Sequence, residues 1–336
     1  MKVLLYTEGL KTVGKSGLGK AVSHQINSLE ENNIEYSLDP KDLKQCDIVH
    51  INFYLLKSYR LAKKAKRMGK KIVYHAHSTK EDFMNSFKFS NLLAPLFKWW
   101  ITKCYRLGDA IITPTEYSKR LLEGYNINRP IYAISNGINV SFFEKDEKLG
   151  KEFRKKYNYK ENDKIIMGVG LYLKRKGILD FLELAKRLPE YKFIWFGYLD
   201  LKLVPKEIKK AVETKLDNLI FAGYVEPEII KTAYSGCDLY LFPTLEETEG
   251  IPILEALTEK IPTLVRDIPV FEEYDADKVV YKAKTIDEFE YKIKAILEKK
   301  LPLLEEEGYK AALKKDTKKV GIQLIEVYKT LIENGR

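Results

Sequence analysis

The sequence alternates between short apolar segments and amphipathic segments, and it does so twice. In the first half, segments rich in β-forming residues predict strands at 3–7, 48–52, 72–75, 110–113 and 131–134. Helical patterns lie between them at 18–32, 56–68, 91–107 and 116–125. The second half repeats the theme with strands at 165–169, 193–196, 219–222, 239–242, 263–265 and 279–281. This alternation predicts an α/β protein with two Rossmann-like, parallel-sheet domains.

The expected domains cover residues 1–145 and 146–317, and a charged stretch at 139–163 connects them. In doubly wound sheets, ligands bind beyond the carboxyl ends of the strands. We therefore expect the functional residues at these ends, facing a central cleft between the domains.

Composition narrows the class of protein. The 336 residues are 45% hydrophobic, and the three widely spaced cysteines suggest neither a disulfide framework nor a zinc site.

The net charge is concentrated in the first half of the chain. Residues 1–150 hold 24 Lys and Arg against 15 Asp and Glu, which is a net charge of +9 out of +10 for the whole chain. Such asymmetry favours a polyanionic partner, either nucleic acid or anionic lipid. No nucleic-acid-binding module is recognisable, so no nucleic acid is expected. The sequence contains no apolar run of membrane-spanning length, and because residues 2–6 predict a strand, we expect no signal peptide.

The segment 243–257 carries two carboxylates around a glycine turn and a predicted helix start. Amides near Gly250 and Ile251 would lie at the helix N-terminus, which suits phosphate. Glu247 precedes the helix, and Glu255 is expected in its first turn. The layout fits a nucleotide diphosphate with a polyol on each side, and the alternative is a solvated acidic loop.

A cationic loop follows the first strand of the second half. Lys174, Arg175 and Lys176 stand directly before Gly177. Three cations at a strand end can neutralise a diphosphate leaving group, and the alternative is again a solvated loop.

Two further motifs lie in the first half. His75 and His77 end a strand and share a face, but no third metal ligand is evident, so a structural role is the alternative. The segment 9–16 matches the P-loop pattern of nucleotide triphosphatases. However, Gly17 and Gly19 follow at once and would delay the helix that a P-loop needs. The alternative is a glycine-rich loop that an acceptor approaches closely.

Two cationic segments of the first half fit a membrane surface. Residues 57–71 hold eight cations and no acid. In the helix at 92–107, a helical period places Leu93, Leu96, Phe97, Trp100, Ile101 and Cys104 on a core-facing stripe. Lys98, Thr102, Lys103 and Arg106 lie opposite, with Trp99 among them. A tryptophan amid cations fits lipid headgroups, and surface cation–π stacking is the alternative. The residues expected at the membrane are Lys63, Lys64, Lys66, Arg67, Lys98, Trp99, Lys103 and Arg106.

The order of these motifs resembles that of family-four retaining glycosyltransferases with the GT-B fold. The resemblance covers nearly the whole chain: the glycine loop from Ser16, the histidines at 75–77, Asn136-Gly137, Lys176-Gly177 and the Glu-x7-Glu segment from Glu247. Within the family, the sequence is most similar to bacterial diacylglycerol glucosyltransferases.

The resemblance implies a hexosyltransferase that moves glucose from UDP-glucose to diacylglycerol or a glycosyl-diacylglycerol. A polyprenyl-linked or cell-surface polysaccharide acceptor is the first alternative, and a P-loop NTPase is the second. The resemblance also implies a C-terminal helix at about 318–336 that crosses back onto the first domain, no cofactor or catalytic metal, and a cytoplasmic protein peripherally bound to the inner face of the cell membrane. It makes no prediction of oligomeric state.

The resemblance assigns three groups of site residues. The catalytic residues are His77, Lys176 and Glu247. The donor-binding residues are Gly170, Arg175, Lys176, Gly197, Tyr198, Val225, Glu247, Gly250, Ile251, Leu254 and Glu255. The acceptor-binding residues are Ser16, Gly17, Leu18, His24 and His77.

Overall fold

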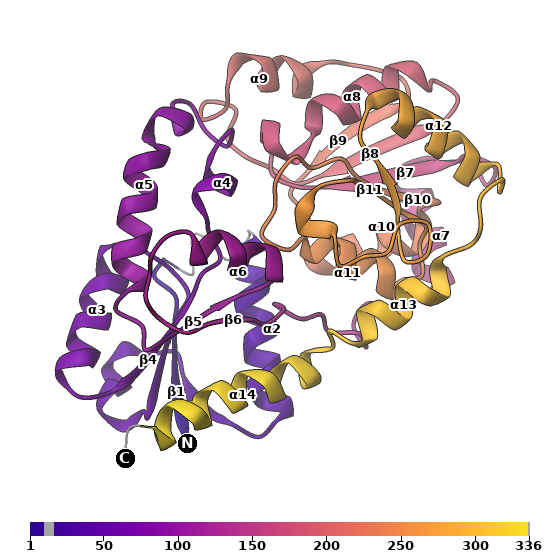
Figure 1. Cartoon of the computed structure of the whole chain (residues 1–336). Coiled ribbons are helices and arrows are strands. Elements are labelled where there is room, and N and C mark those ends of the chain that lie inside the picture. Colours follow the sequence, from indigo (N-terminus) through magenta and orange to yellow (C-terminus); the bar gives the residue numbers. More distant parts are fainter. Residues whose placement is uncertain (10–16, 335–336) are drawn as a thin grey trace. The chain divides into compact units, whose positions relative to one another are not determined.

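A computed structural model describes residues 1–9 and 17–334 of the chain. It divides into two compact units, shown in Figure 1. The first unit comprises Met1–Phe83, Leu92–Asn139 and Lys315–Arg336, and the second comprises Met84–Asn91 and Val140–Lys314. The main boundary therefore falls at Asn139, slightly before the expected one. The sequence did not predict that the short segment Met84–Asn91 groups with the second unit.

The first unit is built on a six-stranded parallel sheet with the order β2-β1-β3-β4-β5-β6. Its strands are β1 (Lys2–Tyr6), β2 (Glu35–Ser37), β3 (Ile48–Ile51), β4 (Lys71–His75), β5 (Ala110–Thr113) and β6 (Ile131–Ala133). Its α-helices are α2 (Gly17–Glu31), α3 (Leu56–Arg67), α4 (Lys80–Phe83), α5 (Ser90–Tyr105), α6 (Glu116–Glu123) and α14 (Thr317–Glu333), and a 3-10 helix, η1, spans Pro40–Gln45. Although α5 begins at Ser90, most of it belongs to the first unit.

The second unit repeats this plan with the strand order β12-β11-β10-β7-β8-β9. Its strands are β7 (Ile165–Val169), β8 (Lys192–Phe196), β9 (Leu219–Gly223), β10 (Leu239–Phe242), β11 (Thr263–Arg266) and β12 (Tyr281–Ala283). Its helices are α7 (Glu147–Lys156), η2 (Lys174–Lys176), α8 (Ile178–Arg187), α9 (Lys206–Glu213), α10 (Pro227–Gly236), α11 (Ile251–Thr258), η3 (Pro269–Phe271), α12 (Ile286–Leu297) and α13 (Glu305–Leu313). The predicted pair of parallel α/β sheets is confirmed.

The central strands are apolar because both of their faces are covered. Ile48–Ile51 and Ala110–Thr113 are buried along their whole length, and so is Leu239–Phe242 in the second unit. Strands of this kind consist almost entirely of apolar residues, rather than of apolar residues that alternate with polar ones. Burial of these runs supplies the main free energy that holds each sheet to its helices.

The C-terminal helix α14 belongs to the first unit and packs along α2. Val320 and Leu324 share a core cluster with Val3 of β1. At Gly321, an added Cβ would lie 2.5 Å from the carbonyl oxygen of Ser28, so glycine permits the close approach of the two helices. Helix α14, near the end of the chain, is thereby packed against the sheet that contains the first strand, β1.

Helix α5 corrects one prediction from the sequence. Leu93 and Leu96 were expected in the core, but they are 46% and 61% exposed. Thr102, expected outside, is buried, and the ammonium group of Lys98 lies 4.2 Å from the centre of the Tyr125 ring. Ile101 and Cys104 are buried and Phe97 and Trp100 pack against the core, as predicted. The buried side also includes Ala94, Thr102 and Tyr105, so it is rotated away from Leu93 and Leu96.

Within residues 1–9 and 17–334, no helix combines the length and the apolar character needed to cross a bilayer.

Candidate active site

The predicted donor residues of the second unit gather at one edge of its sheet. Strands β10, β7, β8 and β9 are neighbours and run parallel, so their carboxyl ends lie side by side. Gly170 follows β7, Gly197 follows β8, Val225 lies just beyond β9, and the loop to Glu247 follows β10. This is the edge at which ligands of such sheets bind.

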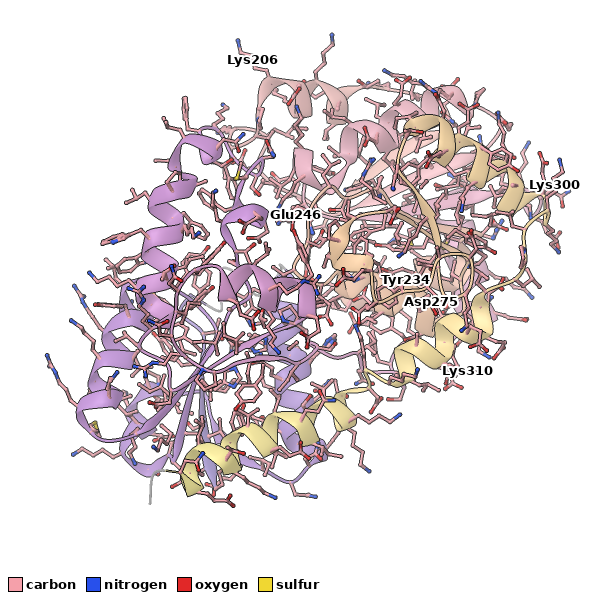
Figure 2. All side chains as sticks on the ribbon, in the orientation of Figure 1. Lys206, Tyr234, Glu246, Asp275, Lys300 and Lys310 are labelled. Carbon is pink, nitrogen blue, oxygen red and sulfur yellow. The ribbon has the colours of Figure 1, made fainter. Side chains whose placement is uncertain are left out.

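Two cations converge on one carboxylate at this edge. Lys176 Nζ donates to Glu247 Oε1, and Arg175 Nη1 lies 3.7 Å from the same oxygen. Thr244 adds its hydroxyl to that oxygen at 2.9 Å. Arg175 also donates at 3.1 Å to the carbonyl oxygen of Glu246, a residue of the loop after β10 that Figure 2 labels. The sequence predicted both charged groups but neither their direct contact nor Thr244.

The charge state of Glu247 follows from these neighbours. Its side chain is buried, and burial alone raises the pKa of a carboxyl group. The adjacent charges of Lys176 and Arg175 and the hydrogen bonds outweigh burial, so the pKa of Glu247 lies below its ordinary value. Glu247 is therefore a carboxylate at neutral pH.

Two glycines permit the loops of this edge to come together. Gly177 has φ +76°, and an added Cβ would lie 2.1 Å from the carbonyl oxygen of Pro243. Gly197 has φ +127°, and its Cβ would lie 2.1 Å from the carbonyl oxygen of Gly170. Both the left-handed conformation and the lack of space exclude other residues. These glycines therefore hold the cationic loop against β10 and the β8 loop against β7.

Glu255 differs from the prediction in position and surroundings. Helix α11 starts at Ile251, so Glu255 lies in its second turn and not in its first. The side chain is fully buried, and Tyr234 of α10, which Figure 2 labels, donates its hydroxyl to Glu255 Oε2 at 3.0 Å. The same hydroxyl lies 3.1 Å from the carbonyl oxygen of Pro252. The segment 243–257 gave no sign of Tyr234, which belongs to a different helix.

The remaining donor candidates differ in exposure. Gly250 adopts φ +92° directly before α11, in agreement with the predicted glycine turn. Ile251 and Leu254 are buried, and Leu254 is completely so. Tyr198 is 53% exposed and Val225 is half-buried. Of these remaining candidates, Tyr198 and Val225 therefore have exposed side-chain surface that a ligand can contact.

A further buried carboxyl group, Glu259, follows α11. Ser235 donates its hydroxyl to Glu259 Oε2 at 2.8 Å, while Oε1 is buried and has no hydrogen-bond partner among the described residues. Burial raises the pKa of Glu259 to about 7 from an ordinary value of 4.5. The folded protein therefore holds this proton at pH values where the unfolded chain has lost it.

We expect this carboxyl group to make stability fall as pH rises. Between pH 4.5 and about 7 the unfolded chain releases the proton first, so the free energy of unfolding decreases across that window, by on the order of 3 kcal/mol in total. Glu259→Gln should remove the dependence and be more stable than wild type at pH 8. Urea unfolding at pH 5 and pH 8 measures this. Glu333→Gln, an exposed change, is the control, and an unchanged pH slope in Glu259→Gln would contradict the expectation.

All four histidines of the chain lie in the first unit, and three are in direct contact. His75 and His77 stack with ring centres 4.0 Å apart and planes at 3°, so the prediction that they share a face is confirmed. His50 Nε2 lies 3.2 Å from His75 Nδ1, and Gln25 Nε2 donates to that same nitrogen at 2.7 Å. His77 Nε2 donates to Asn52 Oδ1 at 2.9 Å. The cluster occupies the carboxyl ends of β3 and β4.

Burial keeps these histidines neutral. It lowers the pKa of His50 to about 3 and, together with the nearby His50, the pKa of His77 to about 3. The pKa of His75 lies well below its ordinary value because of burial and its two histidine neighbours. At neutral pH each ring therefore carries one N–H donor and one acceptor nitrogen.

The predicted acceptor residues are only partly described. Ser16 and the P-loop-like segment up to it lie outside the described residues, apart from Gly9. Gly17 is exposed at the start of α2, and Leu18 packs against the core. His24 donates from Nδ1 to the carbonyl oxygen of Gly137 at 2.7 Å. His24 thus links α2 to the Asn-Gly turn that the sequence singled out.

The predicted membrane residues lie on α3, on α5 and just beyond α5, and the two helices are neighbours (Figure 1). Seven of the eight are exposed, namely Lys63, Lys64, Lys66, Arg67, Trp99, Lys103 and Arg106. Lys98 is half-buried. Lys63, Lys66 and Arg67 also line a surface hollow together with Leu107.

Within the described part of the chain, no group of three or more His, Cys, Asp or Glu side chains is placed to hold a metal ion.

Comparison with known proteins identifies relatives of the whole chain. The chain is 40% identical over 340 residues to the processive diacylglycerol alpha-glucosyltransferase of Acholeplasma laidlawii, covering 100% of both chains. It is 28% identical to the alpha-galactosylglucosyldiacylglycerol synthase of Streptococcus pneumoniae, over 68% of this chain and 62% of that one. The crystal structure of Anabaena HepE with UDP-glucose is similar with a TM-score of 0.78 at 15% identity, covering 98% of this chain and 100% of that one.

The fold and the site define a glycosyltransferase of the GT-B class. Residues 150–319 match the family described as glycosyl transferases group 1, and residues 35–142 match glycosyltransferase family 4. The chain belongs to the group 1 glycosyl transferases. The predicted family and fold are confirmed, and the comparisons favour this activity over the alternative of a P-loop NTPase.

Proposed function

We propose that the protein transfers glucose from UDP-glucose to a diacylglycerol-type lipid with retention of configuration. The convergence of Arg175, Lys176 and Glu247 at the strand ends carries this proposal. The relatives support the acceptor, since their names describe glucosyl transfer to diacylglycerol and the synthesis of a glycosyl-diacylglycerol. Because glucose is α-linked in UDP-glucose, an α-glucoside product requires retention.

The cations would act on the leaving group. When the glycosidic bond of UDP-glucose breaks, negative charge develops on the β-phosphate, and Lys176 and Arg175 would stabilise it. The acceptor hydroxyl would attack from the same face and give its proton to the departing phosphate. No metal is needed for this charge stabilisation, so we propose a metal-independent reaction.

Glu247 would orient the sugar. The contacts from Lys176, Arg175 and Thr244 all reach its Oε1. Among the described residues, Oε2 has no hydrogen-bond partner. Since Glu247 is ionised, Oε2 would accept hydrogen bonds from the hexose hydroxyls.

His77 would contact the reacting hydroxyl. Its Nε2–H is held by Asn52, so Nδ1 of the neutral ring is the acceptor nitrogen. Nδ1 would accept the hydrogen bond of the bound hydroxyl and so orient its oxygen, and the proton would then pass to the departing phosphate oxygen, where negative charge develops.

The outer face of α5 would hold the protein at the membrane. Leu92, Leu96 and Trp99 lie on one side of this helix and are 78%, 61% and 57% exposed. Lys103 continues the row and places its ammonium group 5.0 Å from the Trp99 ring centre. An apolar row that ends in cations, beside the basic helix α3, fits an anionic bilayer surface. We therefore propose a peripheral protein at the inner face of the cell membrane.

The test uses vesicles of phosphatidylglycerol and diacylglycerol with radiolabelled UDP-glucose, UDP-galactose or GDP-mannose. We expect glucose transfer only, giving a labelled glycolipid that an α-glucosidase cleaves, and undiminished transfer in excess EDTA. Polyprenyl phosphate and a soluble polysaccharide are the alternative acceptors. Transfer to either of these without transfer to diacylglycerol would contradict the lipid proposal. Loss of activity in EDTA that Mg²⁺ restores would contradict the metal-independent mechanism.

A further inference from the structure

The histidine cluster of the first unit is joined to the C-terminal helix by a chain of hydrogen bonds. Tyr328 of α14 is buried, and its hydroxyl lies 2.5 Å from His50 Nδ1. His50 in turn reaches His75 Nδ1, and His75 stacks on His77. The four rings come from α14, from β3, and from β4 and the residues that follow it.

The directions of these hydrogen bonds follow from the number of protons available. A phenol has one hydrogen, and in the described structure His50 is the only acceptor that Tyr328 reaches. If Tyr328 donates to Nδ1, then His50 carries its hydrogen on Nε2 and donates it to His75 Nδ1. Gln25 Nε2 donates to the same nitrogen, so both donors require His75 Nδ1 to carry no hydrogen. His75 must then carry its own hydrogen on Nε2.

The reverse arrangement is less favourable. It would leave the Tyr328 hydroxyl and the Gln25 amide as buried donors without acceptors, and each buried unpaired polar group costs about 1–3 kcal/mol. In the forward arrangement, the hydrogen bonds among Tyr328, His50, His75 and Gln25 leave the His75 Nε2–H donor and the Gln25 Oε1 acceptor without a partner among the described residues. The forward arrangement therefore fixes the tautomer of both rings.

His77 is held from two sides. Asn52 fixes its edge through Nε2, and His75 covers its face across 4.0 Å with nearly parallel planes. A rotation of the His75 ring would break this stacking and leave the His77 ring held by Asn52 at one edge only. The plane of His77 thus depends on His75, and the plane of His75 depends on His50.

We infer that Tyr328 is a positioning residue for His77, acting through His50 and His75 from a helix at the far end of the sequence. The inference rests on the proposed function, in which His77 contacts the reacting hydroxyl. The C-terminal helix then does more than complete the fold of the first unit. It sets the orientation of a ring that takes part in the reaction.

The kinetic test compares Tyr328→Phe with Tyr74→Phe. Both changes remove one hydroxyl from a fully buried ring of the first unit, but the Tyr74 hydroxyl has no hydrogen-bond partner among the described residues. We expect Tyr328→Phe to lower kcat at least fivefold with KM for UDP-glucose within twofold, and Tyr74→Phe to leave both unchanged. His50→Gln keeps an acceptor and a donor and should retain more activity than His50→Leu. Adding Tyr328→Phe to His50→Leu should have no further effect.

The spectroscopic test records the ring nitrogens of 15N-histidine-labelled protein without substrate. We expect His50 and His75 as Nε2–H tautomers in wild type and a mixture of tautomers in Tyr328→Phe. The inference is overturned if kcat of Tyr328→Phe equals that of wild type, or if kcat falls while the ring signals of His50 and His75 stay unchanged. A different lipid acceptor would leave these ring signals as expected, so failure of the proposed function can be told apart from failure of this inference.

Discussion

Replacing Lys176 by alanine is expected to lower kcat by roughly 10²- to 10³-fold, which is the size of effect seen when one charge-stabilising group is removed from a transition state. Lys176 is the cation that contacts Glu247 directly, and it lies beside Gly170, with its Cγ 3.3 Å from where a Cβ of that residue would stand. It is thus fixed at the strand ends, where the diphosphate is proposed to bind. Arg175 remains in the variant, which is why some activity should survive.

The loop supplies a matched control. Lys174 stands two residues earlier, is exposed, and pairs with Glu207 at 3.1 Å. Lys174→Ala should change kcat less than twofold, since exposed ion pairs contribute little. Initial rates with UDP-glucose and diacylglycerol vesicles measure both variants. Circular dichroism must show that each is folded, because removing one partner of a buried ion pair is destabilising. A folded Lys176→Ala protein with a rate within threefold of wild type would contradict the proposed role of Lys176 in stabilising the leaving phosphate.

The fold could be predicted from the sequence because its buried strands are apolar. Segments such as Ile165–Val169 and Leu239–Phe242 stand out wherever both faces of a strand are covered. The strand that was missed, Glu35–Ser37, is short, polar and at the sheet edge, so it lacks that signal. The face of α5 was misassigned for a related reason: a helix rich in apolar residues on all sides has no single stripe that reveals which side is buried.

The site could be predicted in part. Glu247 and Lys176 were found because each follows a strand that ends at the same edge of the sheet. Their common partner Thr244 is less evident, because threonine is frequent in loops. The Tyr328–His50 contact joins residues 278 positions apart, and a single sequence carries no sign of such pairs. Tyr234 against Glu255 is a similar case, since nothing in α10 marks one tyrosine as the partner of a carboxyl group.

The second large effect is expected at the membrane. Changing Leu92, Leu96 and Trp99 together to serine should weaken vesicle binding by at least roughly 10²-fold. Full burial of one large apolar side chain is worth about 1.5–3 kcal/mol, and 10²-fold corresponds to about 2.7 kcal/mol, which partial burial of the three would supply. Changing Lys63, Lys64, Lys66 and Arg67 to serine should have a different signature. Each cation near an anionic leaflet is worth about 1 kcal/mol, and this term is screened by salt. Co-sedimentation with phosphatidylglycerol and phosphatidylcholine vesicles across a salt series separates the two terms.

The two variants should therefore fail in different ways. The serine variant of α5 should bind weakly to both lipids, and its residual binding to phosphatidylglycerol should disappear with salt, because only charge is left. The variant of α3 should lose most of its preference for phosphatidylglycerol and become less sensitive to salt, because Lys103 and Arg106 remain but apolar contact then dominates. A control with Tyr291→Ser and Leu303→Ser removes equally exposed side chains from the second unit. A second control changes Lys206 and Lys300, which project from that unit (Figure 2). If either control weakens binding as much as its counterpart, attraction to the bilayer is a general property of the surface rather than of α3 and α5, and the proposed membrane face is wrong.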